Sequence, residues 1–310
     1  MSKTESLTLA LIAQRYSSED EARAYLENLR WPEGPACPHC GSAEVYRLTA
    51  KVNSVKPGRK GLLKCKYCRK QFTVTVGTIF EASHIPLNKW MMAIYLLCSS
   101  KKGMSAHQLH RMLSITYKAA WFMCHRIRYA MEEGPNRAKF FGIIEADETY
   151  VGGKRHGGKE KAGRPGPDSN KVPVFALVQR GGNVRAFPIE RVTAENLRSA
   201  LNENAEASSR IMTDDSILYT SIRDDFASHE TVNHSKREYV RGDVSTNTIE
   251  GFFGIFKRGI NGVYHHLSKK HLHRYTTEFE FRYNARKVSD GLRTHAAIAG
   301  FEGKRLKYRD

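Results

Sequence analysis

The nine residues Gly142-Ile-Ile-Glu-Ala-Asp-Glu-Thr-Tyr150 combine a short apolar run with Asp147 directly after it. The run predicts a buried β-strand over residues 140–146 that ends at the carboxylate. A second apolar run, Arg210-Ile-Met-Thr213, is followed in the same way by Asp214. The two runs therefore predict buried strands that each end at an acidic residue, and we expect these acids to meet at a single point.

A third acidic residue lies in Thr246-Asn-Thr-Ile-Glu-Gly-Phe-Phe-Gly-Ile-Phe-Lys257, which has the spacing of an amphipathic helix. Glu250 and Lys257 are seven residues apart and share one side of this helix with Asn247. Arg258 follows the lysine, so both cations can reach a phosphate. The opposite side carries the apolar residues that we expect to be buried: Ile249, Phe252, Phe253 and Phe256.

Three carboxylates at one point predict a catalytic metal site. Hard divalent cations prefer carboxylate oxygens. Two Mg²⁺ or Mn²⁺ ions ~3.5–4 Å apart can activate a water or a 3′-hydroxyl group and stabilise the leaving oxygen of a phosphodiester. We expect Asp147 to bridge the two ions, and Asp214 and Glu250 to complete the site. Glu145 shares the strand face of Asp147 and is an alternative auxiliary acid. His234 can contact substrate phosphate or assist proton transfer, although a packed loop histidine explains it equally well.

The order of the predicted elements around these acids indicates the fold. Strands are expected over 140–146, 171–179, 183–189 and 210–213, with a further short strand near 231–233. Helices are expected from Thr193 to about 207, and over 216–224, 246–258 and 268–287. Three early strands, a helix, another strand and then the helix with the third acid follow the order of the RNase H-like fold. The predicted class is therefore α/β with an RNase H-like catalytic core.

Four of the six cysteines form two closely spaced pairs, Cys37-Pro-His-Cys40 and Cys65-Lys-Tyr-Cys68. Strand-like pieces lie between and after the pairs, at 45–48, 61–64 and 71–76. Two thiolate pairs on hairpin turns make a tetrahedral site for one structural Zn²⁺, as in a zinc ribbon. Disulfides are the weaker interpretation, because we find no secretory signal in the chain.

Residues 86–133 have helical spacing, and Ser105 and Thr116 are the expected N-caps of two helices joined by a short turn. The pair is similar to a helix-turn-helix, whose second helix presents polar and basic side chains to a DNA groove or to phosphates. The residues expected on that side are Tyr117, Lys118, His125, Arg126 and Arg128. Helix pairs with basic faces also occur in proteins that bind no DNA, so this interpretation depends on the neighbouring ribbon and on the total charge.

The charge balance indicates a polyanionic partner. Fifty lysines and arginines against 32 acidic residues give a formal net charge of +18, and such an excess is typical of nucleic-acid-binding proteins. The segment 152–171 is rich in Gly and Lys, so we expect a mobile basic loop in which Lys154 and Arg155 contact DNA. No run approaches the ~20 apolar residues of a membrane span. We therefore expect a cytoplasmic, nucleoid-associated protein.

Taken together, these motifs resemble those of DDE-type insertion-sequence transposases of the zinc-ribbon group, the bacterial relatives of the Merlin transposons. Beyond the cysteine pairs, the matching stretches are Asp147-Glu-Thr-Tyr-Val-Gly-Gly153, Thr213-Asp214, His234-Ser-Lys-Arg-Glu-Tyr-Val240, Asn247-Thr-Ile-Glu-Gly-Phe-Phe-Gly-Ile-Phe-Lys-Arg-Gly-Ile260 and Phe281-Arg-Tyr-Asn284. The resemblance spans residues 20 to 290 approximately. It implies divalent metal at an RNase H-like core, cleavage at element ends, transfer into target DNA, and a dimer or larger assembly on double-stranded DNA.

The third metal position is the one point where this pattern leaves a choice. Members of the group differ over whether Glu or Asn fills that position, and this chain carries both, at 250 and 247. Glu250 is the better candidate, because a charged carboxylate binds Mg²⁺ more strongly than an amide does. Asn247 would then orient a ligand or a water molecule.

The predicted organisation has five parts and one principal function. The parts are an N-terminal helical segment (1–30), a zinc ribbon (31–80), a helix-turn-helix-like helical domain (81–135), the catalytic domain (136–290) and a basic C-terminal tail (291–310). The predicted function is that of a DNA transposase that binds element ends and catalyses metal-dependent strand cleavage and strand transfer. One alternative is a sequence-specific zinc-ribbon regulator with an inactive core, which would not need three converging acids. The other is a structure-specific nuclease, which would not need so large a recognition region.

Overall fold

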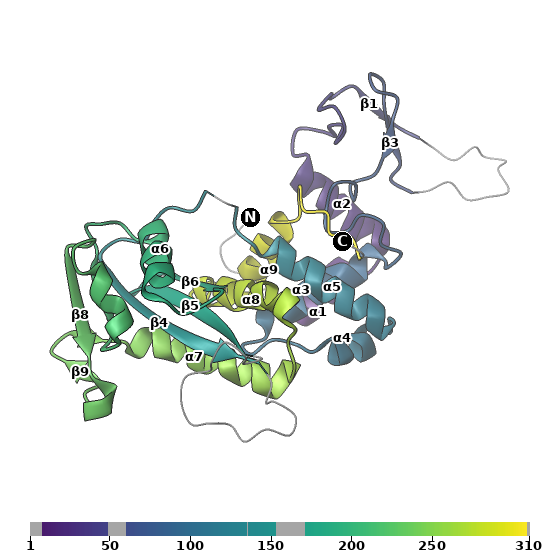
Figure 1. The fold of residues 1–310 in the computed structure, drawn as a ribbon. Coiled ribbons are helices and arrows are strands. Elements are labelled where there is room, and N and C mark those ends of the chain that lie inside the picture. The colour runs from purple at the N-terminus through teal and green to yellow at the C-terminus, as the bar shows by residue number, and fades with distance from the viewer. Residues whose placement is uncertain (1–7, 49–59, 135, 153–170, 309–310) are drawn as a thin grey trace. The chain divides into compact units, whose positions relative to one another are not determined.

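The computed structural model describes residues 8–48, 60–134, 136–152 and 171–308 (Figure 1). It consists of two compact units. The first comprises Met1–Ser100, Met104–Met131 and Val288–Asp310, and the second comprises Lys101–Gly103 and Glu132–Lys287. The long segment of the second unit corresponds to the expected catalytic domain (136–290). Its first residue, Glu132, lies four residues before the expected start, and its last, Lys287, lies three residues before the expected end. No helix in the described part of the chain has the length and apolar character needed to span a bilayer.

The first unit begins with two helices, α1 (Leu9–Arg15) and α2 (Glu19–Arg30). Ser18 and Glu21 form the expected capping box at the start of α2. The Ser18 hydroxyl accepts a hydrogen bond from the Glu21 backbone N–H, and the Glu21 carboxylate accepts one from the Ser18 N–H at 2.9 Å. The capping box satisfies two N–H groups that have no partner within the helix, so it explains why α2 begins where it does.

A small antiparallel sheet with three strands follows in the first unit: β1 (Val45–Arg47), β2 (Leu63–Cys65) and β3 (Gln71–Phe72). The third strand was expected to continue to residue 76, but the chain turns directly after Phe72. The core of this three-stranded sheet is a small cluster of buried residues that contains Cys37, Leu63, Cys65 and Phe72. So small a core is typical of domains that need a further source of stability, such as a metal ion.

Four further helices belong to the first unit: α3 (Leu87–Ser99), α4 (Ala106–Leu113), α5 (Tyr117–Ala130) and α9 (Asp290–Ala299). The expected N-caps of α4 and α5 are confirmed, because the side chains of Ser105 and Thr116 accept backbone hydrogen bonds there. Helix α9 corrects the expectation of a basic tail over 291–310. Ser289 caps this helix, and α9 packs against α3 with Ala297 and Ile298 buried.

The second unit contains a sheet with five strands: β4 (Ile143–Val151), β5 (Val172–Gln179), β6 (Val184–Pro188), β7 (Arg210–Asp214) and β8 (Ser228–Val232). Their order is β6-β5-β4-β7-β8. Strand β5 is antiparallel to both β4 and β6, whereas β4, β7 and β8 run parallel. This topology is that of the RNase H-like fold. Strand β4 is longer than expected, because its pairing with β5 continues as far as Val151.

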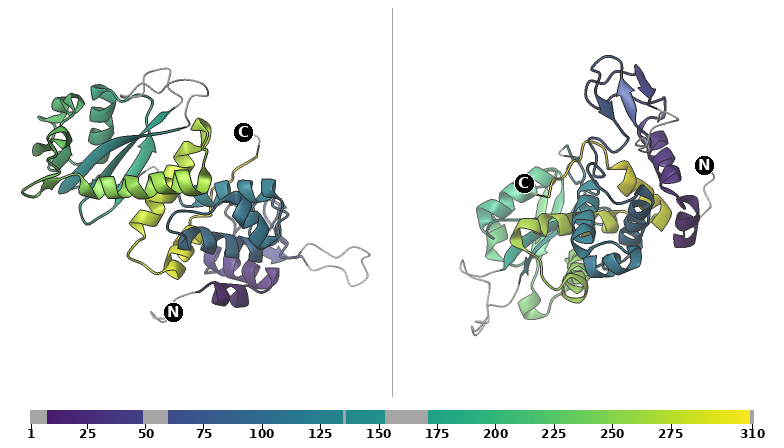
Figure 2. Two further views of the ribbon diagram at one scale, coloured as in Figure 1. Left: turned by 90° about the horizontal axis from the view of Figure 1, so that it is seen from below. Right: turned by 90° about the vertical axis from the view of Figure 1, so that its right-hand side faces the viewer.

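Both faces of this sheet are covered by helices (Figures 1 and 2). One face packs with α6 (Ala194–Asn204) and the 3₁₀ helix Ile217–Ile222. The other face packs with α7 (Asn247–Gly259) and α8 (Leu272–Asn284), and the predicted stripe of Ile249, Phe252, Phe253 and Phe256 is buried there. The shorter elements of this unit are β9 (Val240–Arg241), β10 (Val244–Ser245), 3₁₀ helices at His234–Lys236 and Lys269–His271, and a π-helical turn at Ile260–Tyr264.

Helix α8 covers the free edge of β6 with side chains instead of a further strand. The Asn284 amide accepts a hydrogen bond from the Val184 N–H at 2.8 Å and donates one to the Val184 carbonyl at 3.0 Å. Glu280 accepts a hydrogen bond from the Ala186 N–H at 3.1 Å. Edge strands expose unpaired backbone groups, so this arrangement gives a structural role to Asn284 in the stretch Phe281-Arg-Tyr-Asn284.

Candidate active site and metal centre

Asp147 and Asp214 lie at equivalent positions on adjacent parallel strands. In the register of β4 with β7, Glu145 stands opposite Met212, and each aspartate follows two residues later on its own strand. Side chains two residues apart project from the same face of a sheet, and neighbouring strands are about 4.8 Å apart. Both carboxylates therefore project from the face that packs against α7.

The electrostatics of Asp147 show that the third acid belongs to the same cluster. Burial of the carboxyl group, together with the negative charges of Glu148, Asp214 and Glu250, raises the pKa of Asp147 to about 7. Only the backbone N–H of Glu148, which donates to Asp147 Oδ1 at 2.8 Å, acts in the opposite sense. A carboxyl group whose pKa is raised by neighbouring negative charges suits a site for a hard cation, because the cation would remove the repulsion. Asp214 and Glu250, the other two predicted acids, are thus close enough to Asp147 for their charges to act on it.

The spacing of these carboxylates differs from that of the cysteines described below. Among the described residues, the cysteines alone form a group of three or more ligand atoms that all lie within 4.8 Å of one another. The acids therefore stand further apart than the ligands of one small ion would.

Glu250 is held by two neighbours near the start of α7. The Thr246 hydroxyl donates to Glu250 Oε1 at 2.9 Å, and His234 Nε2 lies 3.2 Å from the same oxygen. His234 Nε2 is also 3.2 Å from the Thr246 hydroxyl oxygen. His234 thus contacts Glu250, the third predicted acid, and Thr246 is a second neighbour of that acid, which the sequence pattern did not indicate. Asn247 has an exposed side chain on the first turn of α7.

Lys257 and Arg258 are exposed at the other end of α7. Lys257 lines a cavity of about 130 Å³ together with residues of β4 and of the π-helical turn, among them Tyr150 and Asn261, and with His266 just after that turn. This cavity therefore lies about two turns further along α7 than Glu250.

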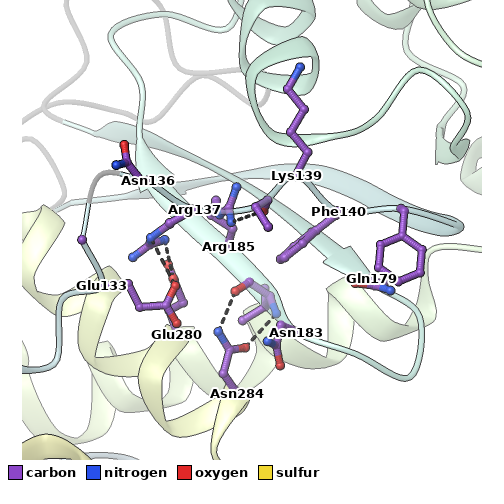
Figure 3. A pocket seen from close by; sticks show the side chains of 14 residues that line it. Glu133, Asn136, Arg137, Lys139, Phe140, Gln179, Asn183, Arg185, Glu280 and Asn284 are labelled. Carbon is purple, nitrogen blue, oxygen red and sulfur yellow. Dashed lines mark hydrogen bonds and ion pairs between the residues drawn. The ribbon is translucent and has the colours of Figure 1, made fainter.

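Glu145 corrects one expectation for the acidic site. It was considered as an auxiliary acid, but its side chain is fully buried. Its two oxygens accept hydrogen bonds from Arg180 and from the first turn of α7. These partners occupy the carboxylate, so it is not available to a metal ion. A different feature, a pocket of about 370 Å³, lies near the residues that precede β4 and is lined by Arg137, Arg185 and Glu280 among others (Figure 3).

The four predicted zinc ligands come together in the first unit. The Sγ atoms of Cys37 and Cys68 are 3.6 Å apart, and those of Cys40 and Cys65 are 3.7 Å apart. Zinc–sulfur bonds of ~2.3 Å in a tetrahedron require sulfur–sulfur distances of about 3.8 Å, so the group fits Zn²⁺ closely. The backbone N–H of Cys68 lowers the pKa of the Cys65 thiol to about 7, which favours the thiolate that a metal ion binds.

The predicted DNA-binding side of α5 is only partly exposed. Tyr117 and Lys118 are exposed, and the Lys118 ammonium lies 4.7 Å from the centre of the Tyr308 ring. The expectation that His125, Arg126 and Arg128 face DNA is wrong, because all three side chains are buried. Lys154 and Arg155, with the rest of the predicted mobile loop from 153 to 170, lie outside the described residues.

Arg126 shows why a basic residue is buried in α5. Its guanidinium donates to the Ile79 carbonyl at 2.9 Å and lies 4.4 Å from the centre of the Phe122 ring. A buried arginine is tolerated where hydrogen bonds and an aromatic ring replace water. Arg126 therefore stabilises the first unit rather than forming part of a DNA-binding surface.

We expect the two kinds of basic residue on α5 to respond differently to replacement. Lys118→Ala should weaken DNA binding and lower the slope of log affinity against log salt by about one, because one phosphate contact is lost. Arg126→Ala should instead lower the free energy of unfolding by roughly 1–3 kcal/mol, because a buried carbonyl loses its donor. Fluorescence anisotropy at several salt concentrations and thermal unfolding distinguish the two effects. A salt slope unchanged in Lys118→Ala would remove this residue from the DNA surface.

Comparisons with known proteins agree with this architecture. Residues 139–284 match the model of the ISXO2-like transposase domain, and residues 17–71 match the transposase zinc-ribbon domain. An uncharacterized protein in the transposable element ISH50 of Halobacterium salinarum is 30% identical over 279 residues, which are 86% of this chain and 91% of the relative. An RNase H-like core joined to a zinc ribbon of this kind defines a DNA transposase. The chain belongs to the family of zinc-ribbon transposases with an ISXO2-like transposase domain.

Solved structures of Mos1 transposase assemblies are more distant. A pre-cleavage Mos1 transpososome is 13% identical, with a TM-score of 0.28 over 70% of this chain and 79% of that chain. The Mos1 strand transfer complex is 10% identical, with a TM-score of 0.30 over 67% of this chain and 73% of that chain.

Proposed function

We propose that this transposase cuts DNA at the ends of its element and joins those ends to target DNA, with Asp147, Asp214 and Glu250 as ligands of two Mg²⁺ or Mn²⁺ ions. The observation that carries the proposal is the equivalent position of the two aspartates on β4 and β7, with the charge of Glu250 acting on Asp147. When bound, such ions activate the attacking hydroxyl or water and stabilise the leaving oxygen. Asp147 is central in the cluster, so it is our candidate for the bridging ligand.

The other residues of the site have supporting roles in this proposal. Thr246 and His234 hold Glu250 in place through its Oε1 atom. Glu250 is preferred to Asn247 as the third ligand, because its charge reaches Asp147. Asn247 would orient a ligand or water from the same turn of α7. Lys257 and Arg258 would bind backbone phosphates further along the DNA strand, because both are exposed cations on the same helix.

DNA recognition is proposed for the first unit. One Zn²⁺ held by Cys37, Cys40, Cys65 and Cys68 would stabilise the ribbon, and the ribbon with α4 and α5 would bind the element ends as double-stranded DNA. Transfer of both ends of one element requires two active sites at once, so we expect a dimer or larger assembly on DNA. The substrate would be nucleoid DNA in the cytoplasm.

A joining assay tests the proposed function. Purified protein, an element-end duplex, a second target duplex and Mg²⁺ should yield strands nicked at the element end and covalently joined to the target. Metal-dependent cleavage without joining would identify a nuclease. Specific binding with neither reaction, at any concentration of Mg²⁺ or Mn²⁺, would identify a DNA-binding regulator and overturn the proposal.

A further inference from the structure

The first turn of α7 is anchored to the sheet by Glu145. One carboxylate oxygen of Glu145 accepts hydrogen bonds from the backbone N–H groups of Thr248 at 2.7 Å and of Ile249 at 3.0 Å. The other oxygen accepts one from the Thr248 hydroxyl at 2.9 Å. Glu145 is on β4, two residues before Asp147, and about a hundred residues before this helix in the sequence.

This anchor takes the place of an ordinary N-cap. Thr246 occupies the N-cap position of α7, yet its side chain makes no capping hydrogen bond there. Its hydroxyl donates to Glu250 instead. The N–H groups of a first turn need acceptors, and a carboxylate is favoured at this positive end of the helix dipole. Glu145 therefore caps the helix from outside, which leaves Thr246 free to orient Glu250.

Arg180 completes the anchor on its other side. Its guanidinium donates to Glu145 Oε1 at 2.8 and 2.9 Å, and to the backbone carbonyls of Asp243 at 2.7 Å and Ser245 at 3.2 Å. It therefore ties the segment that leads into α7 to the same carboxylate that caps the helix. The positive charge also compensates the buried charge of Glu145.

We propose that Glu145 is a positioning residue that sets the place of Glu250 relative to Asp147. Strand β4 carries both Asp147 and Glu145, and the Glu145 carboxylate binds the turn of α7 that contains Glu250. Glu145 therefore connects the two proposed ligands, Asp147 and Glu250, through a strand and a helix. Without it, the first turn of α7 would lose its acceptor and Glu250 would lose its fixed distance from Asp147. The inference rests on the proposed role of Asp147 and Glu250 in binding the metal ions.

Glu145→Gln tests this link in the full-length protein, because the amide keeps the shape but loses the charge that Arg180 and the helix require. We expect the Mg²⁺ concentration for half-maximal strand cleavage to rise about 10–100-fold, with DNA affinity unchanged. Binding of Mn²⁺, measured by electron paramagnetic resonance, should weaken by a similar factor. Amide hydrogen exchange should become faster in the first turn of α7, and this readout is independent of activity.

Thr248→Val is the milder second variant, since it removes only the hydroxyl donor to Glu145. It should shift the metal dependence in the same direction by a smaller factor.

Glu280→Gln is the matched control, because Glu280 resembles Glu145 in its surroundings. It is also buried, pairs with Arg137 at 2.6 Å and accepts a hydrogen bond from a backbone N–H, but it lies on α8 at the edge of the sheet (Figure 3). Burial raises the pKa of its carboxyl group to about 7, so the amide should be well tolerated there. Metal dependence and exchange in the first turn of α7 should remain as in the wild type.

The outcomes separate this inference from the proposed function. Suppose that the wild type cleaves DNA and that Glu145→Gln is folded, with the same metal dependence and the same hydrogen exchange in α7 as the wild type. That result would overturn the positioning role and leave the proposed function intact. Equal shifts in Glu280→Gln would also overturn it, because the effect would then be general destabilisation. Wild-type protein without any metal-dependent chemistry would remove the proposed function and the inference with it. Shifts in Glu145→Gln and Thr248→Val, but not in the control, support the inference.

Discussion

Asp147→Asn is expected to abolish strand cleavage and joining while DNA binding stays at the wild-type level. The amide has nearly the shape of the carboxylate but carries no charge, and a bridging ligand without charge cannot hold two divalent ions close together. We expect the rate of cleavage to fall by at least about a thousandfold, because one charged group in a reaction centre already contributes a large share of transition-state stabilisation. Gel analysis of labelled element ends measures this loss directly, and anisotropy measures the retained affinity.

The same variant should differ from the wild type in how metal affects its stability. Asp147 is surrounded by the negative charges of Glu148, Asp214 and Glu250, so its replacement relieves repulsion when no cation is bound. Without metal, the variant should therefore unfold at the same temperature as the wild type or higher. Mg²⁺ should raise the unfolding temperature of the wild type, because the ion binds only the folded state, and should have little effect on the variant.

Two further variants identify the third ligand. Glu250→Gln should reproduce the loss seen in Asp147→Asn, whereas Asn247→Ala should retain most of the cleavage. Strong Mg²⁺-dependent cleavage by Asp147→Asn would show that the assignment of the site is wrong. Loss of activity in Asn247→Ala with activity kept in Glu250→Gln would transfer the third position to the amide.

The fold was predictable wherever local pattern and burial agree. The apolar runs before Asp147 and Asp214 and the helical stripe around Glu250 are local signals, and the structure has a strand or helix at each of them. The end of β4 was not predictable from its own residues, because only pairing with β5 carries the strand past Asp147. Helix α9 was missed for a similar reason, since its buried residues are recognisable as a helix face only once α3 is in place.

The sequence indicated candidate metal ligands, but it did not indicate the residues that position those ligands. Spacing indicated the four cysteines that the structure brings together, because metal ligation imposes residue types and sequence distances, and it also singled out the three acids that we propose as metal ligands. The anchoring role of Glu145 depends on a helix that lies far along the chain, so no short pattern contains it. The burial of Arg126 also has no local signal. The Phe122 ring lies one turn before Arg126 in the same helix, but the carbonyl that accepts from the guanidinium belongs to Ile79, outside α5.

Removal of zinc is expected to unfold the ribbon and to abolish specific binding of element ends. The ribbon has three strands of two or three residues, and the cysteines themselves make up much of its buried cluster. A core of that size cannot offset the conformational entropy of ordering the chain, whereas structural zinc contributes roughly 10–16 kcal/mol in zinc-finger peptides. Replacing Cys37 and Cys65 together with serine should therefore have the same effect as a strong chelator.

The measurements must show separately what happens to zinc, to recognition and to the second unit. Wild-type protein should contain one zinc ion per chain by mass spectrometry, and the double variant none. The affinity for element ends should fall to the level seen with nonspecific DNA, while limited proteolysis should still yield a protected fragment near Glu132–Lys287.

Cys124→Ala is the control, because Cys124 is buried in α5 outside the zinc group and its replacement should leave the metal content unchanged. Retained end-specific binding without zinc would contradict the role of the ribbon. Loss of the protected fragment would contradict the independence of the two units, because the second unit holds none of the four cysteines and its sheet and helices have a core of their own.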